Sequence, residues 1–341
     1  MADGTSPRER LLRVLARETV DRPPVACPGG MMNAAVVDVM RETGNPLPEA
    51  YQDPTRLAQL ARDVSERTGF ENLALPFCMT IEAELLGSRI DPGTLACEAK
   101  IADEAFPSVR QARLPMLERI PEGGRAQRVL QAIALTAARK PDQPVIGSLT
   151  GPVSTAGSVI DPITFLKELR KERDGSHRVL DQVTAAIAKV AEAMVEAGVD
   201  VIAISDPTAT GEILGPRAFE EFALRYLNDL TDRIHAWGVP VIVHICGDIH
   251  PVEHLVARLH AQAVSTDAAV SLARLKAAHP ALVTMGNVST QTLQFGEPER
   301  IAARTRQLVE EGVDIIAPAC GLSTSTPLRN IRALTDAVRE A

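Results

Sequence analysis

The sequence predicts an α/β protein folded as a single (β/α)8 TIM barrel domain over residues 1–341. Eight short runs rich in β-branched residues alternate with longer segments whose apolar residues recur three and four positions apart. This alternation indicates a parallel sheet covered by helices. The length suits one barrel of about 250 residues with insertions. No G-x-G-x-x-G motif follows the first run, which argues against a dinucleotide-binding sheet.

The predicted elements follow one another in a regular order. The strands are expected at residues 24–27, 72–76, 144–149, 199–205, 239–246, 263–267, 282–287 and 313–317. The helical patterns lie at residues 55–69, 123–140, 176–197, 216–236, 250–260, 269–278, 297–311 and 327–340. Gly198 and Gly312 each end a helix just before a Val-Asp pair that begins the next strand. The same helix-to-strand connection therefore occurs twice.

Two segments lie outside the repeat. Residues 1–20 contain a helical pattern from about 7 to 18, an N-terminal helix that we expect at the bottom of the barrel. Residues 88–121 contain Pro92, Gly93, Pro107 and Pro115 among alternating residues, which predicts an inserted hairpin or loop after the second strand.

The composition excludes several classes of protein. The 36 basic and 44 acidic residues give a net charge of -8, and only 3% of residues are aromatic. Nucleic acid is therefore not an expected partner, because binding it needs a basic face and usually stacking rings. No apolar stretch approaches 18 residues, so no membrane span is expected. The first ten residues contain no apolar signal segment, and the expected location is the cytoplasm.

The cysteines suit a reducing compartment. Their number is odd and their spacing fits no disulfide framework, with thiols at Cys27, Cys78, Cys97, Cys246 and Cys320. Some of them are then available to bind a metal or to take part in catalysis.

Soft metal ligands stand at the ends of two predicted strands, where active sites of barrels form. His244 and Cys246 lie two positions apart on one strand and so point to the same face, while Cys320 follows the last strand. One imidazole and two thiolates make a zinc site with an open fourth position, as in catalytic sites. Buried cysteines and hydrogen-bonded histidines are also common in ordinary cores. The third ligand at a matching strand end favours the metal.

Other polar residues end neighbouring strands. Asp206, Asp267 and Asn287 close the fourth, sixth and seventh strands, and a carboxylate there can orient a metal-bound histidine. Each of the three is equally well explained as the N-cap of the helix that follows. Glu82 and Glu84 are candidates for a fourth zinc ligand, or else acidic residues of a helix's first turn.

These motifs make the chain resemble the uroporphyrinogen decarboxylase superfamily over nearly its whole length, and within it the methylcobamide:coenzyme M methyltransferases (MtaA/MtbA-like enzymes). The resemblance is carried by residues 76–80, 147–155, 203–207, 243–247, 285–289, 317–321 and 326–328. In that branch the His-x-Cys pair and the distant cysteine bind zinc, which implies that role for His244, Cys246 and Cys320. The decarboxylases need an arginine-bearing segment after the first strand. This chain has Cys-Pro-Gly-Gly-Met-Met-Asn at residues 27–33 instead, so decarboxylation of a tetrapyrrole is not expected.

The resemblance implies a zinc-dependent methyltransferase. It would move a methyl group from a methylated corrinoid, carried by a partner corrinoid protein, to a zinc-activated thiol, with coenzyme M as the first candidate. Homocysteine or tetrahydrofolate as acceptor, and decarboxylation as in the parent superfamily, are the alternatives. No Asp-x-His-x-x-Gly signature is present, so the chain is not expected to carry its own corrinoid. The resemblance does not decide whether the protein forms a homo-oligomer.

The remaining site residues are assigned from their places at or just after the strand ends. Asp206 is expected to join the three zinc ligands as a catalytic residue. Gly29, Gly30 and Asn33 offer backbone and side-chain donors to the sulfonate of coenzyme M, although the glycines serve equally well to make a turn. Asp267 and Asn287 are the further candidates for binding substrate.

Overall fold

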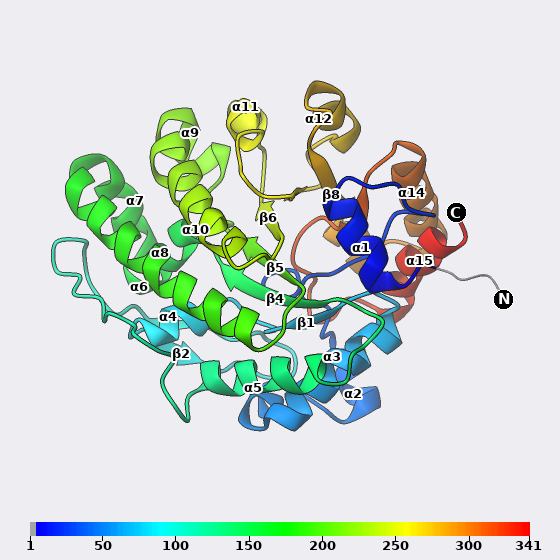
Figure 1. Ribbon diagram of the computed structural model, residues 1–341, viewed down its shortest axis with the longest axis horizontal. Coiled ribbons are helices and arrows are strands. Elements are labelled where there is room, and N and C mark those ends of the chain that lie inside the picture. Colours follow the sequence, from blue (N-terminus) through cyan, green and yellow to red (C-terminus); the bar gives the residue numbers. More distant parts are fainter. Residues whose placement is uncertain (1–4) are drawn as a thin grey trace.

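The computed structural model describes residues 5–341 and has a parallel sheet curled into a barrel wall (Figure 1). Seven parallel strands follow one another in the order β1-β4-β5-β6-β7-β8-β9. Their bounds are β1 Leu73–Leu75, β4 Val145–Thr150, β5 Val201–Ser205, β6 Val241–Ile245, β7 Ala263–Thr266, β8 Val283–Val288 and β9 Ile315–Pro318. Every residue of these strands is buried, since helices cover the outer face. The predicted α/β barrel is confirmed.

The helices lie on the outside of the sheet and at its ends. They are α1 Pro7–Leu15, α2 Val37–Thr43, α3 Pro54–Thr68, α4 Ile81–Leu85, α5 Arg125–Ala137, α6 Pro152–Val159, α7 Pro162–Lys171, α8 Arg173–Glu196, α9 Gly211–Ala218, α10 Arg225–His235, α11 Glu253–Val256, α12 Leu272–Ala278, α13 Thr290–Phe295, α14 Pro298–Glu310 and α15 Leu328–Arg339, with the short η1 Glu49–Gln52, η2 Phe219–Leu224 and η3 His250–Val252. Among the residues described, no helix is both long and apolar enough to cross a bilayer.

The predicted first strand, residues 24–27, forms a single bridge rather than a ladder. Val25 pairs in parallel with Ile316 of β9, and the Ala26 amide donates to the Ile316 carbonyl at 2.9 Å. On the other side, the Asn72 side chain donates to the Cys27 carbonyl and accepts from its amide. Pro24 has no N–H to donate, and a side-chain amide takes the place of the next backbone pair. The segment therefore closes the barrel between β9 and β1 without being a regular strand.

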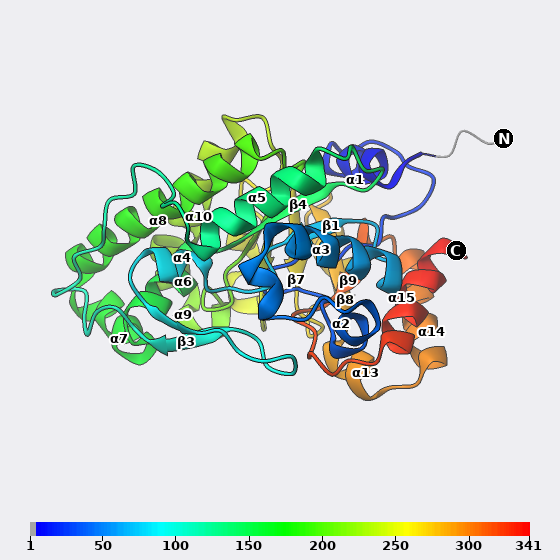
Figure 2. The same ribbon diagram turned by 90° about the horizontal axis from the view of Figure 1, so that it is seen from below.

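The amino ends of the strands are tied to α1. The Arg8 amide donates to the carbonyl of Asp142, just before β4, and its guanidinium donates to Asp200, just before β5. Figure 2 shows α1 at one end of the molecule and the strand β3 at the other. The two Gly-Val-Asp connections behave alike, because Asp200 accepts from the Val145 amide and Asp314 from the Thr284 amide. Each aspartate thus fixes the first residues of the adjacent strand.

The insertion forms an antiparallel hairpin at the opposite end of the barrel. It consists of β2 (Arg89–Asp91) and β3 (Lys100–Asp103), as the alternating sequence predicts. Its tip crosses to other loops at the carboxyl ends of the strands: Thr324 donates to the Ala96 carbonyl at 2.8 Å, and Asn33 donates to Glu98. The hairpin therefore lies against the mouth of the barrel, where the polar strand ends converge.

The helix predicted at residues 216–236 is divided. Gly215 has a positive φ of 69°, Pro216 lacks an amide proton, and a π-helical turn over Phe219–Leu224 joins α9 to α10. Several short helices, α2, α6, α7 and α13, were not expected from the sequence. They are too short to show a clear apolar repeat, and two of them, α6 and α13, follow directly on strand ends.

Candidate metal centre at the mouth of the barrel

Three predicted ligands meet at one point. His244 lies near the end of β6, Cys246 follows that strand, and Cys320 follows β9. One ligand atom from each lies within 4.8 Å of the others, and the two sulfur atoms are 3.3 Å apart. Both strands end at the same rim of the barrel, so residues 74 positions apart in the chain come together there.

The imidazole of His244 is oriented from one side and open on the other. Its Nδ1 lies 2.9 Å from Oγ of Ser265, while its Nε2 is buried and has no hydrogen-bond partner among residues 5–341. His244 as a whole is 2% exposed, and Nε2 itself is buried from solvent. A buried nitrogen without a partner costs free energy unless something accepts its lone pair. A metal ion at the cluster would do so.

The two thiols share a proton. Either sulfur can be the donor of the hydrogen bond between them. This hydrogen bond, and after it the positive charge of His244 when its ring is protonated, lowers the pKa of Cys246 to about 5, and the hydrogen bond raises the pKa of Cys320. Desolvation and the nearby carboxylate of Asp267 oppose the charge on Cys246. One thiolate therefore forms readily at neutral pH, and a cation is needed to stabilise the second.

The donor set fits zinc. Two sulfurs and one imidazole nitrogen are ligands that zinc prefers, and three protein ligands with an open fourth position are typical of catalytic sites. The free nitrogen of His244 and the close sulfur pair are the observations that support the fit.

Asp267 and Asn287 lie beside the cluster. An oxygen of the Asp267 carboxylate is 4.0 Å from the sulfur of Cys246. The Asn287 side chain donates to the backbone carbonyls of Asp267 and Val270 at 2.9 and 2.7 Å, and its own oxygen is buried without a partner in the described structure. Asn287 thus shapes the loop that carries Asp267.

Glu82 and Glu84 are not members of the cluster of three, and their contacts match the second of the two interpretations, acidic residues in the first turn of a helix. The buried carboxylate of Glu82 accepts from the Thr150 amide at 3.0 Å, and burial raises its pKa. Glu84 forms an ion pair with Arg125 at 2.8 Å. Both lie on α4, whose position after β1 turns them toward β4 and α5.

Asp206 has a structural environment rather than a catalytic one. It is fully buried, and its carboxylate accepts hydrogen bonds from the amides of Val153 and Ser154 and from the Ser154 hydroxyl. These groups begin α6, so Asp206 caps a helix from the neighbouring strand end, close to the N-cap role considered above. All its carboxylate hydrogen bonds in residues 5–341 go to this helix. The catalytic assignment is therefore not supported by its contacts.

The buried carboxyl group of Asp206 is expected to make the stability of the folded protein depend on pH. Burial raises the pKa of Asp206 to about 6, so the folded protein binds this proton more tightly than the unfolded chain, whose value is 3.8. The stabilisation is complete below about pH 4 and is lost as the pH rises through 6, amounting to about 3 kcal/mol. We expect urea unfolding from about pH 4 to 7 to show this loss in the wild type but not in Asp206→Asn. Parallel pH curves for the two proteins would contradict it.

The glycines proposed to hold a sulfonate already use their amides. The amide of Gly29 donates to the Met32 carbonyl at 2.9 Å and that of Gly30 to the Pro76 carbonyl at 2.8 Å. Asn33 is buried, donates to Glu98 and accepts from the Ala35 amide. No helix begins here, since α2 starts at Val37. The segment makes a tight turn, the alternative considered from the sequence, in which the amides of Gly29 and Gly30 and the side chain of Asn33 are used within the protein.

The remaining cysteines lie away from the cluster. Cys27 is buried and donates to the Met32 carbonyl, and burial raises its pKa. Cys78 is buried beside the guanidinium of Arg125, at 3.6 Å. Cys97 is exposed on the hairpin. None of these thiols belongs to the cluster of three ligands.

Residues that sequence reasoning missed support the cluster from behind. Ser265 contacts the imidazole, and Met32 lies 3.7 Å from the Ser265 hydroxyl. Gly321 packs so closely on the carbonyl of Met31 that an added Cβ would lie 2.6 Å from it. The signal available in the sequence for Ser265 is the register of two adjacent strands, because it stands directly opposite His244.

A cleft of about 740 Å³ lies on the outer wall rather than at the mouth. It is lined by residues of α8 and α10 and by the segment 114–118, among them Ala185, Lys189, Arg233 and Trp237. None of the three clustered ligands lines it, so we place the chemistry at the cluster, where buried donor atoms converge.

Comparison with known proteins identifies the family of this chain. The family model described as uroporphyrinogen decarboxylase (URO-D) matches residues 6–341. The chain is 32% identical to the methylcobamide:CoM methyltransferase MtaA of Methanosarcina barkeri, over 97% of this chain and 96% of the relative. It is 30% identical to the methylcobamide:CoM methyltransferase MtbA of Methanosarcina mazei, over 98% of each. A solved methyltransferase from Methanosarcina mazei superposes with a TM-score of 0.89 at 32% identity, covering 98% of both chains. The chain therefore belongs to the uroporphyrinogen decarboxylase family.

Proposed function

We propose that this protein is a zinc-dependent methyltransferase. It moves a methyl group from a methylated corrinoid, carried by a partner corrinoid protein, to an acceptor thiol, with coenzyme M as the first candidate. The observation that carries this proposal is the cluster of His244, Cys246 and Cys320, whose donor atoms lie within 4.8 Å of one another. Relatives of this chain named as methylcobamide:CoM methyltransferases support the same reaction.

The three ligands would hold the ion and leave a fourth position for the acceptor. A ring nitrogen of His244 and the sulfurs of Cys246 and Cys320 come together there from two strand ends. Zinc bound there would supply the Lewis acidity that keeps the sulfur of an acceptor thiol deprotonated at neutral pH.

The reaction balances without an added oxidant or reductant. The acceptor thiol releases its proton to water, a carbon–sulfur bond forms, and the cobalt–carbon bond of the donor breaks with the electron pair staying on cobalt. The residues of this chain contribute by positioning: the protein holds the acceptor sulfur at the rim, where a corrinoid presented by its partner protein can approach in line. Asp267, 4.0 Å from the sulfur of Cys246, is a candidate contact for the acceptor, with Asn287 supporting its loop.

The acceptor is the part of the proposal that an assay decides. We expect purified protein to contain about one zinc per chain, as a site of this type binds one ion. With methylcobalamin as donor, the change in corrinoid absorbance and the loss of free thiol should be fastest with coenzyme M. Faster reaction with homocysteine or tetrahydrofolate would change the acceptor but keep the site. Protein that binds no zinc and demethylates the donor with none of the three would contradict the proposed function.

A further inference from the structure

The imidazole of His244 is fixed by one residue of the adjacent strand. We propose that Ser265 is a positioning residue that keeps the proton of the neutral His244 ring on Nδ1 and thereby directs the lone pair of Nε2 at the two cysteine sulfurs. The inference rests on the proposed function, because it concerns how the chain prepares the nitrogen that binds zinc. In the hydrogen bonds described, the Ser265 side chain contacts His244 and Met32 and neither of the other two ligands.

Strand register places this serine. β6 and β7 are parallel neighbours in which His244 stands opposite Ser265, so the two side chains project to the same face. Ser265 is fully buried, and its Oγ lies 2.9 Å from Nδ1 of His244. Among buried residues a hydroxyl without a partner is costly, and this one has two.

The second partner decides which way the hydroxyl points. Oγ of Ser265 donates to the sulfur of Met32 at 3.7 Å. A thioether sulfur has no proton to give, so the hydroxyl proton is used on this side and an oxygen lone pair faces Nδ1. Nδ1 must then be the donor, and it carries the ring proton.

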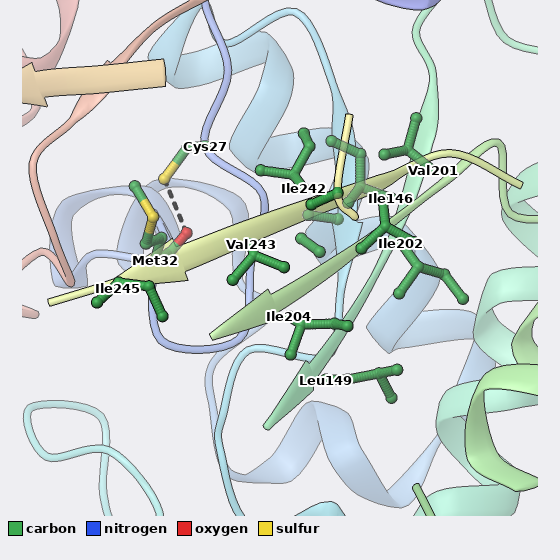
Figure 3. Packing of buried hydrophobic residues seen from close by; sticks show 14 of the residues in the cluster. Cys27, Met32, Ile146, Leu149, Val201, Ile202, Ile204, Ile242, Val243 and Ile245 are labelled. Atoms are coloured by element: carbon green, nitrogen blue, oxygen red, sulfur yellow. Dashed lines mark hydrogen bonds between the residues drawn. The ribbon is translucent and has the colours of Figure 1, made fainter. Parts of the chain in front are cut away.

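Met32 is itself held in place. Its carbonyl accepts from the amide of Gly29 and from the thiol of Cys27, both at 2.9 Å. Figure 3 shows Met32 near the carboxyl end of β6, beside Ile245, with the bond from Cys27 to its carbonyl. The turn after residue 27 therefore holds Met32 in place, Met32 accepts from Ser265, and Ser265 contacts the imidazole. This differs from the anion binding that was one expectation for the glycines of the turn.

The consequence appears at the other nitrogen. With the proton on Nδ1, Nε2 has a free lone pair, and in the described residues this atom is buried and without a partner. The His244 ring supplies one donor atom of the cluster whose atoms lie within 4.8 Å of one another, and Nδ1 is already occupied by Ser265. Outer partners of this kind fix the tautomer and raise the basicity of a histidine ligand, and their loss typically weakens metal binding about 10- to 100-fold.

The test measures the tautomer directly. Metal-free protein labelled with ¹⁵N in histidine is examined by long-range ¹H–¹⁵N correlation, which distinguishes the two ring tautomers, with His244→Gln identifying the signal. We expect the wild type to carry the proton on Nδ1 and Ser265→Ala to show a mixture of both tautomers. Thr266→Val is the matched control, because Thr266 is equally buried on the same strand and its hydroxyl has no partner among the residues described. It should resemble the wild type.

Zinc affinity, measured by competition with a chromophoric chelator, provides the second arm. Ser265→Ala should bind zinc about 10- to 100-fold more weakly, and Thr266→Val as the wild type does. Wild-type His244 with its proton on Nε2 would overturn the proposal without any variant, as would an unchanged tautomer in Ser265→Ala. An Nδ1 proton that depends on Ser265 in a protein that binds no zinc would support the positioning role while refuting the proposed function.

Discussion

Replacing Cys320 by serine is expected to remove zinc from the protein and to abolish methyl transfer from methylcobalamin. Cys320 supplies one of three donor atoms, and a hydroxyl is a much poorer ligand than a thiolate for this ion. Stabilisation of the reacting thiolate by the metal amounts to several kcal/mol, so the rate should fall by about 10³-fold or more. Metal analysis of the purified variant and the rate of corrinoid demethylation measure the two effects.

The matched control is Cys97→Ser. Cys97 is exposed on the hairpin and lies outside the cluster, so its replacement removes a thiol without removing a donor atom. Zinc content and rate should both equal those of the wild type. A Cys320→Ser protein that keeps full activity would show that the cluster is not the site of the reaction.

Replacing Gly29 by alanine is expected to destabilise the fold strongly. Gly29 has a φ of 86°, and an added Cβ would lie 2.9 Å from that of Ala74 and 3.1 Å from the Pro76 carbonyl. The left-handed backbone costs an alanine about 1–2 kcal/mol. Overpacking against these atoms adds about 1–3 kcal/mol. The free energy of unfolding, measured in urea, should therefore fall by about 2–5 kcal/mol.

Gly44→Ala separates the two causes. Gly44 also has a positive φ, 74°, but an added Cβ would meet nothing within 4 Å. Its replacement should cost only the backbone strain of about 1–2 kcal/mol. If the free energy of unfolding falls equally in the two variants, the turn at Gly29 moves to make room for the added Cβ at no cost. Its contacts with β1 would then not hold it in place.

Much of the fold follows from local patterns. Residues 144–149 and 263–267 are short runs of small and β-branched residues between helical segments, and the structure has β4 and β7 at almost the same bounds. Such strands are buried on both faces, so their composition alone indicates a parallel sheet. Residues 24–27 have the same composition but form one bridge, because a strand also needs a neighbour with free backbone groups.

Glu82 and Glu84 show a limit of the same reasoning at the site. Both follow a strand end, as a ligand would, and both carry the right atoms. The direction of α4 turns Glu82 to the Thr150 amide and Glu84 to Arg125. Side-chain direction depends on the axis of a helix that is only five residues long, and five residues carry too little periodicity to set that axis.

The sequence by itself determined the barrel, the ends at which polar residues gather, and the three residues that the structure brings together as a candidate metal centre, His244, Cys246 and Cys320. These features depend on hydrophobic periodicity, composition and the order of the strands, all of which can be read from the sequence. Only the tertiary structure decided that Asp206 caps α6 and that Ser265 and Met32 orient His244. Those contacts join residues tens to hundreds of positions apart, and a serine or methionine in an apolar segment carries no local sign of the partner that folding brings to it.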